Sequence, residues 1–122
     1  MEPKPIKNER RRNARTRLNR PGRIRVGGGS ESYTQLVNIS QRGAALYCTT
    51  AIDPGTDVEV KFHLNIDPRT VWLKLRARVD RCYGRGESHL VRVLFVEPPL
   101  EALETILEFI GYKSAPDESA AP

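Results

Sequence analysis

The sequence predicts a mainly β fold: a six-stranded antiparallel β-barrel followed by one C-terminal α-helix. Short segments in which apolar and polar residues alternate follow one another from residue 23 to residue 96, and Gly, Pro, Asn and Asp separate them. Several such strands with turns between them are typical of a small antiparallel barrel. After Pro98 and Pro99 the apolar repeat changes from two residues to about 3.6, which indicates a helix.

The expected strands differ in clarity. The clearest alternation lies in 57–64, where every second residue is apolar, and it predicts a half-buried strand. Residues 27–30 and 84–86 are expected as hairpin loops. Residues 53–56 are expected as a turn, because Pro fixes φ and Gly permits positive φ. The other alternating runs are 23–26, 33–39, 43–49, 70–81 and 90–96.

The predicted helix begins at Leu100, and Gly111 is placed to cap its end. Its apolar residues are expected to close one mouth of the barrel, and docking of a partner is the alternative. The expected apolar face consists of Leu100, Leu103, Leu107 and Ile110, with Glu101, Glu104 and Glu108 opposite.

At 122 residues the chain is expected to form one domain, since domains usually run to about 100–150 residues. We expect the domain to span 10–112, with disordered tails over 1–9 and 113–122. The net charge of +5 is uneven: the first 26 residues carry ten Lys or Arg and two Asp or Glu. This asymmetry indicates an anionic partner, such as a nucleotide, a nucleic acid or an acidic protein surface.

Several classes of protein are disfavoured. No apolar run approaches the roughly 18 residues of a membrane helix, and the N-terminus lacks the apolar stretch of a signal peptide, so a cytoplasmic protein is expected. Cys48 and Cys82 match no metal spacing and are expected as reduced, buried residues, and His63 and His89 have no ligand partners nearby. No catalytic arrangement is visible, so neither an enzyme nor a metal site is expected.

Two motifs carry chemistry. Arg11 and Arg15 frame an R-x-x-x-R, and an N-x-S-x-x-G turn begins 23 positions after Arg15, at Asn38. Arginine can donate two hydrogen bonds to guanine O6 and N7, stack on a base and pair with phosphate. Each motif alone has a plainer explanation: a solvated basic tail for the first, and an ordinary turn for the second.

The turn offers groups that complement arginine. The Asn38 side-chain oxygen can accept from guanine N1–H or N2–H₂, and Ser40 adds a hydroxyl. Gly43 allows close approach or a positive φ at the entry to the next strand. Arg42 lies inside the turn, where it can reach a phosphate or point into solvent.

In this order and spacing the motifs resemble those of the PilZ domain, over about residues 10–112. The resemblance implies a barrel with a C-terminal helix and a flexible, arginine-rich N-terminal switch loop that closes on cyclic di-GMP, a bacterial second messenger. It places the guanine and phosphate contacts on Arg11 and Arg15, and the surroundings of a guanine on Asn38, Ser40 and Gly43. The family often has Asp at the position of Asn38, so a weaker hold on the guanine edge is expected.

The leading hypothesis is a cyclic di-GMP receptor that orders its arginine-rich N-terminal loop on binding and signals to an effector protein. We call this loop, residues 10–15, the leader. Arg10 can add a contact, and we hypothesise a self-stacked pair of ligand molecules. The alternatives are a PilZ-like adaptor that does not bind the nucleotide and, less favoured, a basic barrel that binds single-stranded nucleic acid. Trp72 is either a surface for a partner or a ring packed under the helix or the leader, and the second interpretation is favoured.

Overall fold

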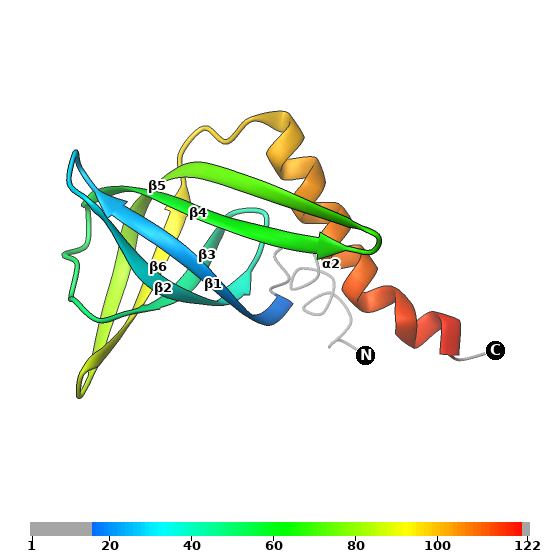
Figure 1. The fold of residues 1–122 in the computed structure, drawn as a ribbon, viewed down its shortest axis with the longest axis horizontal. Helices are drawn as coiled ribbons and strands as arrows, with labels where there is room; N and C mark the ends of the chain where they lie inside the picture. The colour runs from blue at the N-terminus through cyan, green and yellow to red at the C-terminus, as the bar shows by residue number, and fades with distance from the viewer. Residues whose placement is uncertain (1–15, 121–122) are drawn as a thin grey trace, which may run out of the picture.

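The computed structural model describes residues 16–120, without the side chains of residues 85 and 112–120. Six strands close into a barrel in the order β1-β2-β3-β6-β5-β4, and every neighbouring pair is antiparallel. One helix follows (Figure 1). The predicted six-stranded barrel with a C-terminal helix is confirmed. The elements are β1 Thr16–Val26, β2 Glu31–Ile39, β3 Gly43–Cys48, β4 Asp57–Ile66, β5 Arg69–Arg85, β6 Ser88–Phe95 and α2 Leu100–Ala120.

Strand β1 begins seven residues before the alternating pattern that predicted it, at Thr16 rather than Arg23. Pro21 and Gly22 interrupt the local pattern, and pairing with β2 extends the strand in spite of them. Pairing with β4 starts only at Gly22, so Pro21 lies where a missing N–H breaks no bond to β4. Here tertiary pairing decides what local propensity could not.

Strand β5 joins the two halves of the barrel. Its first part, Arg69 to Arg78, pairs with β4, and its second part, Ala77 to Arg85, pairs with β6. The register shifts between Val79 and Arg81. Each half of this long strand therefore belongs to a different wall of the barrel.

The core fills the barrel as the alternation predicts. Inward residues of all six strands are buried, and outward residues are partly or fully exposed, apart from a few such as Ala45. Complete burial of one large apolar side chain stabilises the fold by about 1.5–3 kcal/mol. The largest fully buried side chains are Phe62, Phe109, Leu36, Ile39, Leu46, Leu64 and Ile106.

Helix α2 lies across one end of the barrel, beside the β4–β5 hairpin (Figure 1). Ala102, Ile106 and Phe109 enter the core, so the expected role of closing a mouth is confirmed. The predicted apolar face was wrong for Leu100 and Leu107, which are 69% and 49% exposed, whereas Ile110 packs against the core as predicted. The helix carries two adjacent apolar stripes, and the stripe with the aromatic ring fills the mouth.

The predicted end of the helix was also wrong. Helix α2 continues through Gly111 to Ala120. Glycine inside a helix costs only about 1 kcal/mol relative to alanine, so one glycine does not have to stop it. The proposed division into a domain over 10–112 and two tails stays a prediction.

Both described cysteines are free thiols, and Cys48 is buried. Burial raises the pKa of the Cys48 thiol to about 11, and the nearby Cys82 adds to this effect. The thiol is therefore neutral at physiological pH. Within the described part of the chain, no helix is long and apolar enough to cross a membrane.

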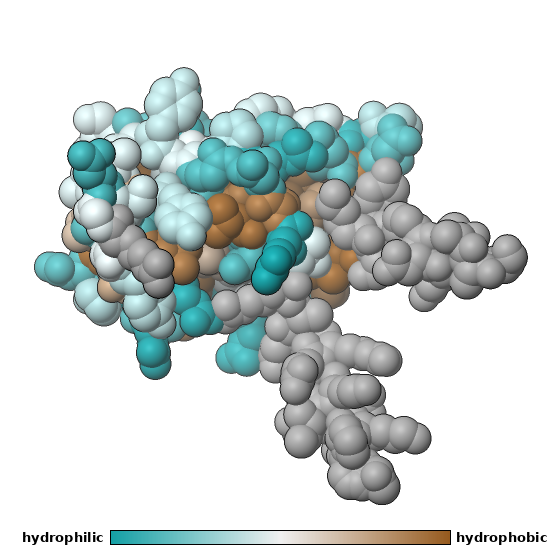
Figure 2. Space-filling model, turned by 90° about the horizontal axis from the view of Figure 1, so that it is seen from below, coloured by the Kyte–Doolittle hydropathy of each residue, from teal (hydrophilic) through white to brown (hydrophobic). Residues whose placement is uncertain are grey.

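Apolar surface also remains outside the core. Figure 2 shows it in a hollowed region, bordered by hydrophilic side chains. Trp72 is 65% exposed, and its ring tilts against His63 at a centroid distance of 4.8 Å. The favoured interpretation, in which this ring packs under the helix or the leader, was wrong for the helix, because the residue is largely exposed. The leader lies outside the described residues.

Candidate functional site

The predicted site residues fall into two groups. Asn38, Ser40 and Gly43 lie within the described chain, at the β2–β3 connection. Arg10, Arg11 and Arg15 lie outside the described residues. The described part of the candidate site is therefore the rim of the barrel at the β2–β3 connection.

Asn38 lies near the end of β2 and is half-buried. It pairs with Arg17 of β1 on one side and Ala45 of β3 on the other. The register of β2 against β3 shifts between Leu36 and Asn38, which marks a bulge. Bulges redirect side chains and are frequent next to functional sites.

Ser40 is buried and holds the turn together. Its Oγ accepts the N–H of Arg42 and of Gly43, each at 3.2 Å, and donates to the carbonyl of Gly43 at 3.3 Å. A hydroxyl has one donor and two acceptor positions, so these bonds occupy all of them. The backbone N–H of Ser40 also donates to the Gly43 carbonyl, at 2.8 Å. In this structure the hydroxyl organises the turn from within.

Gly43 is required by the approach of β3 to β6. A Cβ added at this position would lie 2.0 Å from the carbonyl oxygen of Val93, far inside van der Waals contact. Gly43 is not among the residues with positive φ. Of the two reasons the sequence suggested for this glycine, close approach is the one the structure supports.

Next to this turn the surface is hollowed to a volume of about 300 Å³. The hollow brings together the β2–β3 turn, the start of β3, and strands β5 and β6, and three of its residues are charged. This size is at the lower end of small-molecule sites, which usually measure about 300–1,000 Å³. Its lining consists of Ser40, Arg42, Gly43, Ala44, Asp80, Arg92, Val93 and Leu94.

Sequence reasoning missed Asp80 and Arg92. In the alternating pattern both residues fall on the polar, outward side of their strands. One signal was present: Asp80 and Arg81 are consecutive polar residues, which break the alternation of β5 at the point where its register shifts. The meeting of Arg92 with the turn depends on the pairing of β6 with β3, which no local pattern reveals.

The register of β1 connects the leader to this rim. Thr16 pairs with Ile39, and Arg17 pairs with Asn38. Arg15, the second arginine of the R-x-x-x-R, directly precedes Thr16 in the chain. The first described residues after the R-x-x-x-R therefore pair with the end of β2, next to Asn38 of the second motif.

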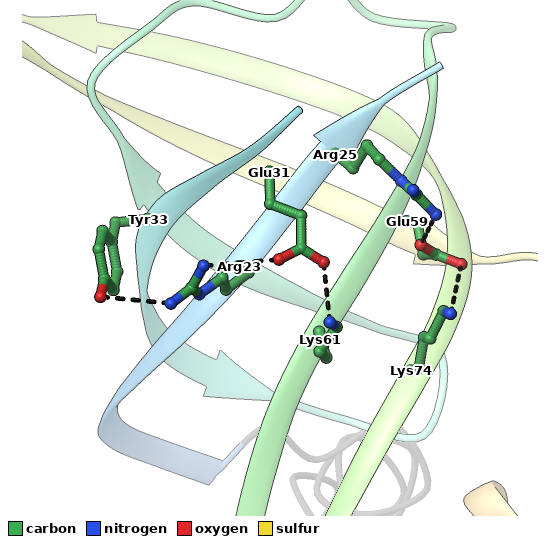
Figure 3. A network of polar contacts seen from close by, with 7 residues as sticks. All are labelled: Arg23, Arg25, Glu31, Tyr33, Glu59, Lys61 and Lys74. Atoms are coloured by element: carbon green, nitrogen blue, oxygen red, sulfur yellow. Dashed lines mark hydrogen bonds and ion pairs between the residues drawn. The ribbon is translucent and has the colours of Figure 1, made fainter. Parts of the chain in front are cut away.

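On the face of the barrel formed by β1, β2, β4 and β5, the charged side chains form ion pairs with one another (Figure 3). We call it the ion-pair face. Glu31 accepts from Lys61 at 2.8 Å and lies 3.5 Å from Arg23, whose guanidinium also stacks over Tyr33 at 4.5 Å. The pKa of Glu31 is lowered, first by the hydrogen bond from Lys61 and then by the charges of Lys61, Arg23 and Arg25. Each cation labelled in Figure 3 has a described partner.

A second group of this face centres on one carboxylate. Glu59 pairs with Arg25 and lies 3.9 Å from Lys74. Beside it, Arg78 pairs with Asp57 at 3.0 Å. Acids and bases thus alternate across β1, β2, β4 and β5. The arrangement satisfies these charges locally.

Fold and rim together define a small β-barrel module with a polar, ligand-sized hollow beside the β2–β3 turn. The sequence matches the PilZ domain family over residues 9–112, so the chain belongs to that family. No curated protein sequence matches it.

Solved structures agree on the fold. The inhibitor of motility MotI/DgrA of Bacillus subtilis has a TM-score of 0.72 at 20% identity, covering 82% of this chain and 49% of its own. YcgR of Escherichia coli in complex with c-di-GMP has a TM-score of 0.70 at 14% identity, covering 92% and 49%. The isolated PilZ domain of YcgR with c-di-GMP has a TM-score of 0.67 at 13% identity, covering 91% and 97%. The chain spans about half the length of the first two proteins.

Proposed function

We propose that this protein is a non-catalytic receptor for cyclic di-GMP. The observation that carries the proposal is the β1–β2 register, in which Arg17 pairs with Asn38. In this register the strand that follows the leader runs beside the N-x-S-x-x-G turn, so we expect the leader to reach the same rim. Family membership and the c-di-GMP named in the structures of YcgR support the choice of ligand.

The ligand has two guanines and two phosphates, and each needs a partner. Arg11 and Arg15 supply forked donors for guanine O6 and N7 or for phosphate oxygens, with Arg10 as an additional contact. Asn38 lies at the rim to accept from a guanine edge. Ser40 and Gly43 set the shape of the turn on which that guanine rests, by internal hydrogen bonds and by close strand packing.

We propose that the position of the leader after binding creates the signal. Binding fixes residues 10–15 against the rim, and the surface made by leader, ligand and barrel is then recognised by an effector protein. A ligand-dependent ordering of this kind is a common switch. The cost of ordering the leader is met by charge-assisted hydrogen bonds to the two phosphates.

Calorimetric titration of cyclic di-GMP tests the proposal. Wild-type protein is expected to bind saturably, and Arg11→Ala to bind about ten- to hundredfold more weakly, because it loses charge-assisted hydrogen bonds. Arg23→Ala is the matched control: this arginine is engaged with Glu31 and Tyr33, so ligand affinity should not change. The ligand-to-chain ratio also decides between one ligand molecule and the stacked pair proposed for Arg10.

Absence of heat in wild-type protein would overturn the receptor proposal and favour the adaptor that acts through protein contacts alone. Equal weakening by Arg11→Ala and Arg23→Ala would show that binding follows general charge rather than this site. Steep salt dependence with oligonucleotides, and no response to the dinucleotide, would favour the nucleic-acid alternative.

A further inference from the structure

Asp80 occupies an unusual place in β5. Val79 pairs with Val93 and Arg81 pairs with Arg92, so Asp80 is the extra residue of a bulge and has no cross-strand partner. Its side chain lines the hollow beside the β2–β3 turn. A bulge at such a point redirects a side chain that regular alternation would align with its strand neighbours.

The charges of the hollow are not neutralised by one another. Among the described residues, the side chains of Arg42, Asp80 and Arg92 make no hydrogen bond or ion pair, although all three line one hollow of about 300 Å³. Asp80 interacts electrostatically with its neighbour Arg81, but no direct ion pair forms between them. On the ion-pair face, in contrast, Arg23 and Lys61 are paired with Glu31. A carboxylate and two guanidinium groups left open around one hollow are suited to a ligand with both donors and anionic oxygens.

The apolar part of the lining completes the arrangement. Val93 and Leu94 of β6 also line the hollow; Val93 is buried, and Leu94 is 47% exposed. An exposed aliphatic side chain gives a flat base a surface to pack on. The hollow thus offers packing surface, one acceptor group and two cations.

We infer that Asp80 selects guanine over adenine, and that Arg92 binds a phosphate of the same ligand. This inference rests on the proposed function, and it concerns residues outside both sequence motifs. It also accounts for the chain having Asn38 where a carboxylate is frequent in the family: the bulge supplies a carboxylate at the same rim.

The selectivity follows from the edges of the two bases. Guanine presents N1–H and N2–H₂ side by side, and one carboxylate can accept from both. Adenine presents an N6–H₂ donor but an N1 lone pair, which a carboxylate repels. A site built to pair with specific donors rejects an analogue that lacks them, because its polar groups are left unpaired. A phosphate contact from Arg92, in contrast, is indifferent to the base.

The test compares cyclic di-GMP with cyclic di-AMP by calorimetric titration and by competition. Asp80→Ala is expected to weaken cyclic di-GMP binding about ten- to hundredfold and to leave cyclic di-AMP binding unchanged or improved. Asp80→Asn should shift the preference further toward cyclic di-AMP, because an amide can donate to adenine N1 and accept from N6–H₂. Arg92→Ala should weaken both dinucleotides by the same factor.

Asp57→Asn is the matched control, since it removes a carboxylate of the ion-pair face that is exposed and paired with Arg78. It should change neither affinity. A thermal melt of each variant confirms that it folds. If wild-type protein binds cyclic di-GMP and the Asp80 variants leave the ratio of the two affinities unchanged, the inference is overturned and the proposed function stands. If wild-type protein binds neither dinucleotide, both fall.

Discussion

Two regions of this barrel carry the same kinds of charged side chain, but the side chains form ion pairs in only one of them. On the face formed by β1, β2, β4 and β5, arginines and lysines are paired with Glu31 and Glu59 (Figure 3). Arg78 is paired with Asp57 on the same face. At the rim beside the β2–β3 turn, Arg42, Arg92 and Asp80 surround a hollow without forming an ion pair with any described residue. Because the same residue types occur in both regions, residue type alone does not distinguish them, and we expect the ligand at the rim, where the charges are open.

The two regions also differ in backbone. The ion-pair face consists of regular ladders: β4 pairs with β5 over ten consecutive residue pairs without a register shift. The rim contains a bulge in β2, a bulge in β5, and a turn held by its own serine. Regular ladders present side chains in fixed rows, whereas bulges turn single side chains toward a shared point. We therefore expect the rim framework to be sensitive to mutation and the ion-pair face to be tolerant.

The largest expected effect is that of Gly43→Ala. The new Cβ would meet the Val93 backbone 2.0 Å away, and backbone cannot move aside as a flexible side chain can. Overpacking usually costs about 1–3 kcal/mol and occasionally more, and we expect the upper end here. Thermal unfolding should show a midpoint lowered by about 10 °C or more, at about 4–8 °C per kcal/mol for a domain of this size.

Gly28→Ala is the control for this prediction. Gly28 lies in the β1–β2 loop, and a Cβ added there would have no atom within 4 Å, so the midpoint should stay close to that of the wild type. A normal midpoint for Gly43→Ala would mean that β3 and β6 can separate at little cost. The rim would then not be the rigid framework that we expect to be sensitive to mutation.

Ser40→Ala should have an intermediate effect. It removes the hydroxyl that accepts two backbone N–H groups and donates to one carbonyl, all within a buried turn. Unsatisfied buried groups cost about 1–3 kcal/mol, so urea unfolding should show a loss of that size, while Ser32→Ala on the exposed part of β2 should show little. Cyclic di-GMP affinity should fall together with stability. A loss of affinity at unchanged stability would instead indicate that the hydroxyl contacts the ligand directly.

Much of the fold could be predicted from the sequence, because alternation with a period of two is a local signal. The strand over 57–64 and the turn at 53–56 needed no tertiary information. The face of α2 could not be predicted: Leu107 and Ile106 both belong to plausible apolar stripes, and the shape of the barrel mouth decides between them. Which stripe is buried is a property of the assembled core.

The candidate site divides in the same way. Asn38, Ser40 and Gly43 could be identified because the motif fixes their spacing within one turn. Asp80 and Arg92 come from strands that meet the turn only through the β3–β6 and β5–β6 registers. In the sequence Arg92 resembles Arg23, yet one lines a hollow without a described ion-pair partner and the other is paired with Glu31. Pairing of surface charges depends on register, which local patterns do not specify.

The smallest effect is expected for Glu31, a residue of the ion-pair face, which we expect to tolerate mutation. In the folded protein the pKa of Glu31 lies below its ordinary value of 4.5, mainly because Lys61 donates a hydrogen bond to the carboxylate. A lowered folded-state pKa means that ionised Glu31 favours the folded state above the unfolded pKa. This contribution is lost as the pH falls below about 4.5 and through the folded pKa. Because the pair is solvent-exposed, salt should screen it.

Glu31→Gln should therefore lower the free energy of unfolding slightly at neutral pH in low salt. The difference in this free energy between variant and wild type should shrink in high salt and at about pH 3. Urea unfolding at the two pH values measures it, with Glu87→Gln in the β5–β6 hairpin as the control, since Glu87 is exposed and forms no described ion pair. Affinity for cyclic di-GMP should not change. A marked loss of affinity in Glu31→Gln would show that the ion-pair face supports the rim, because the charges of the two regions would then act as one network.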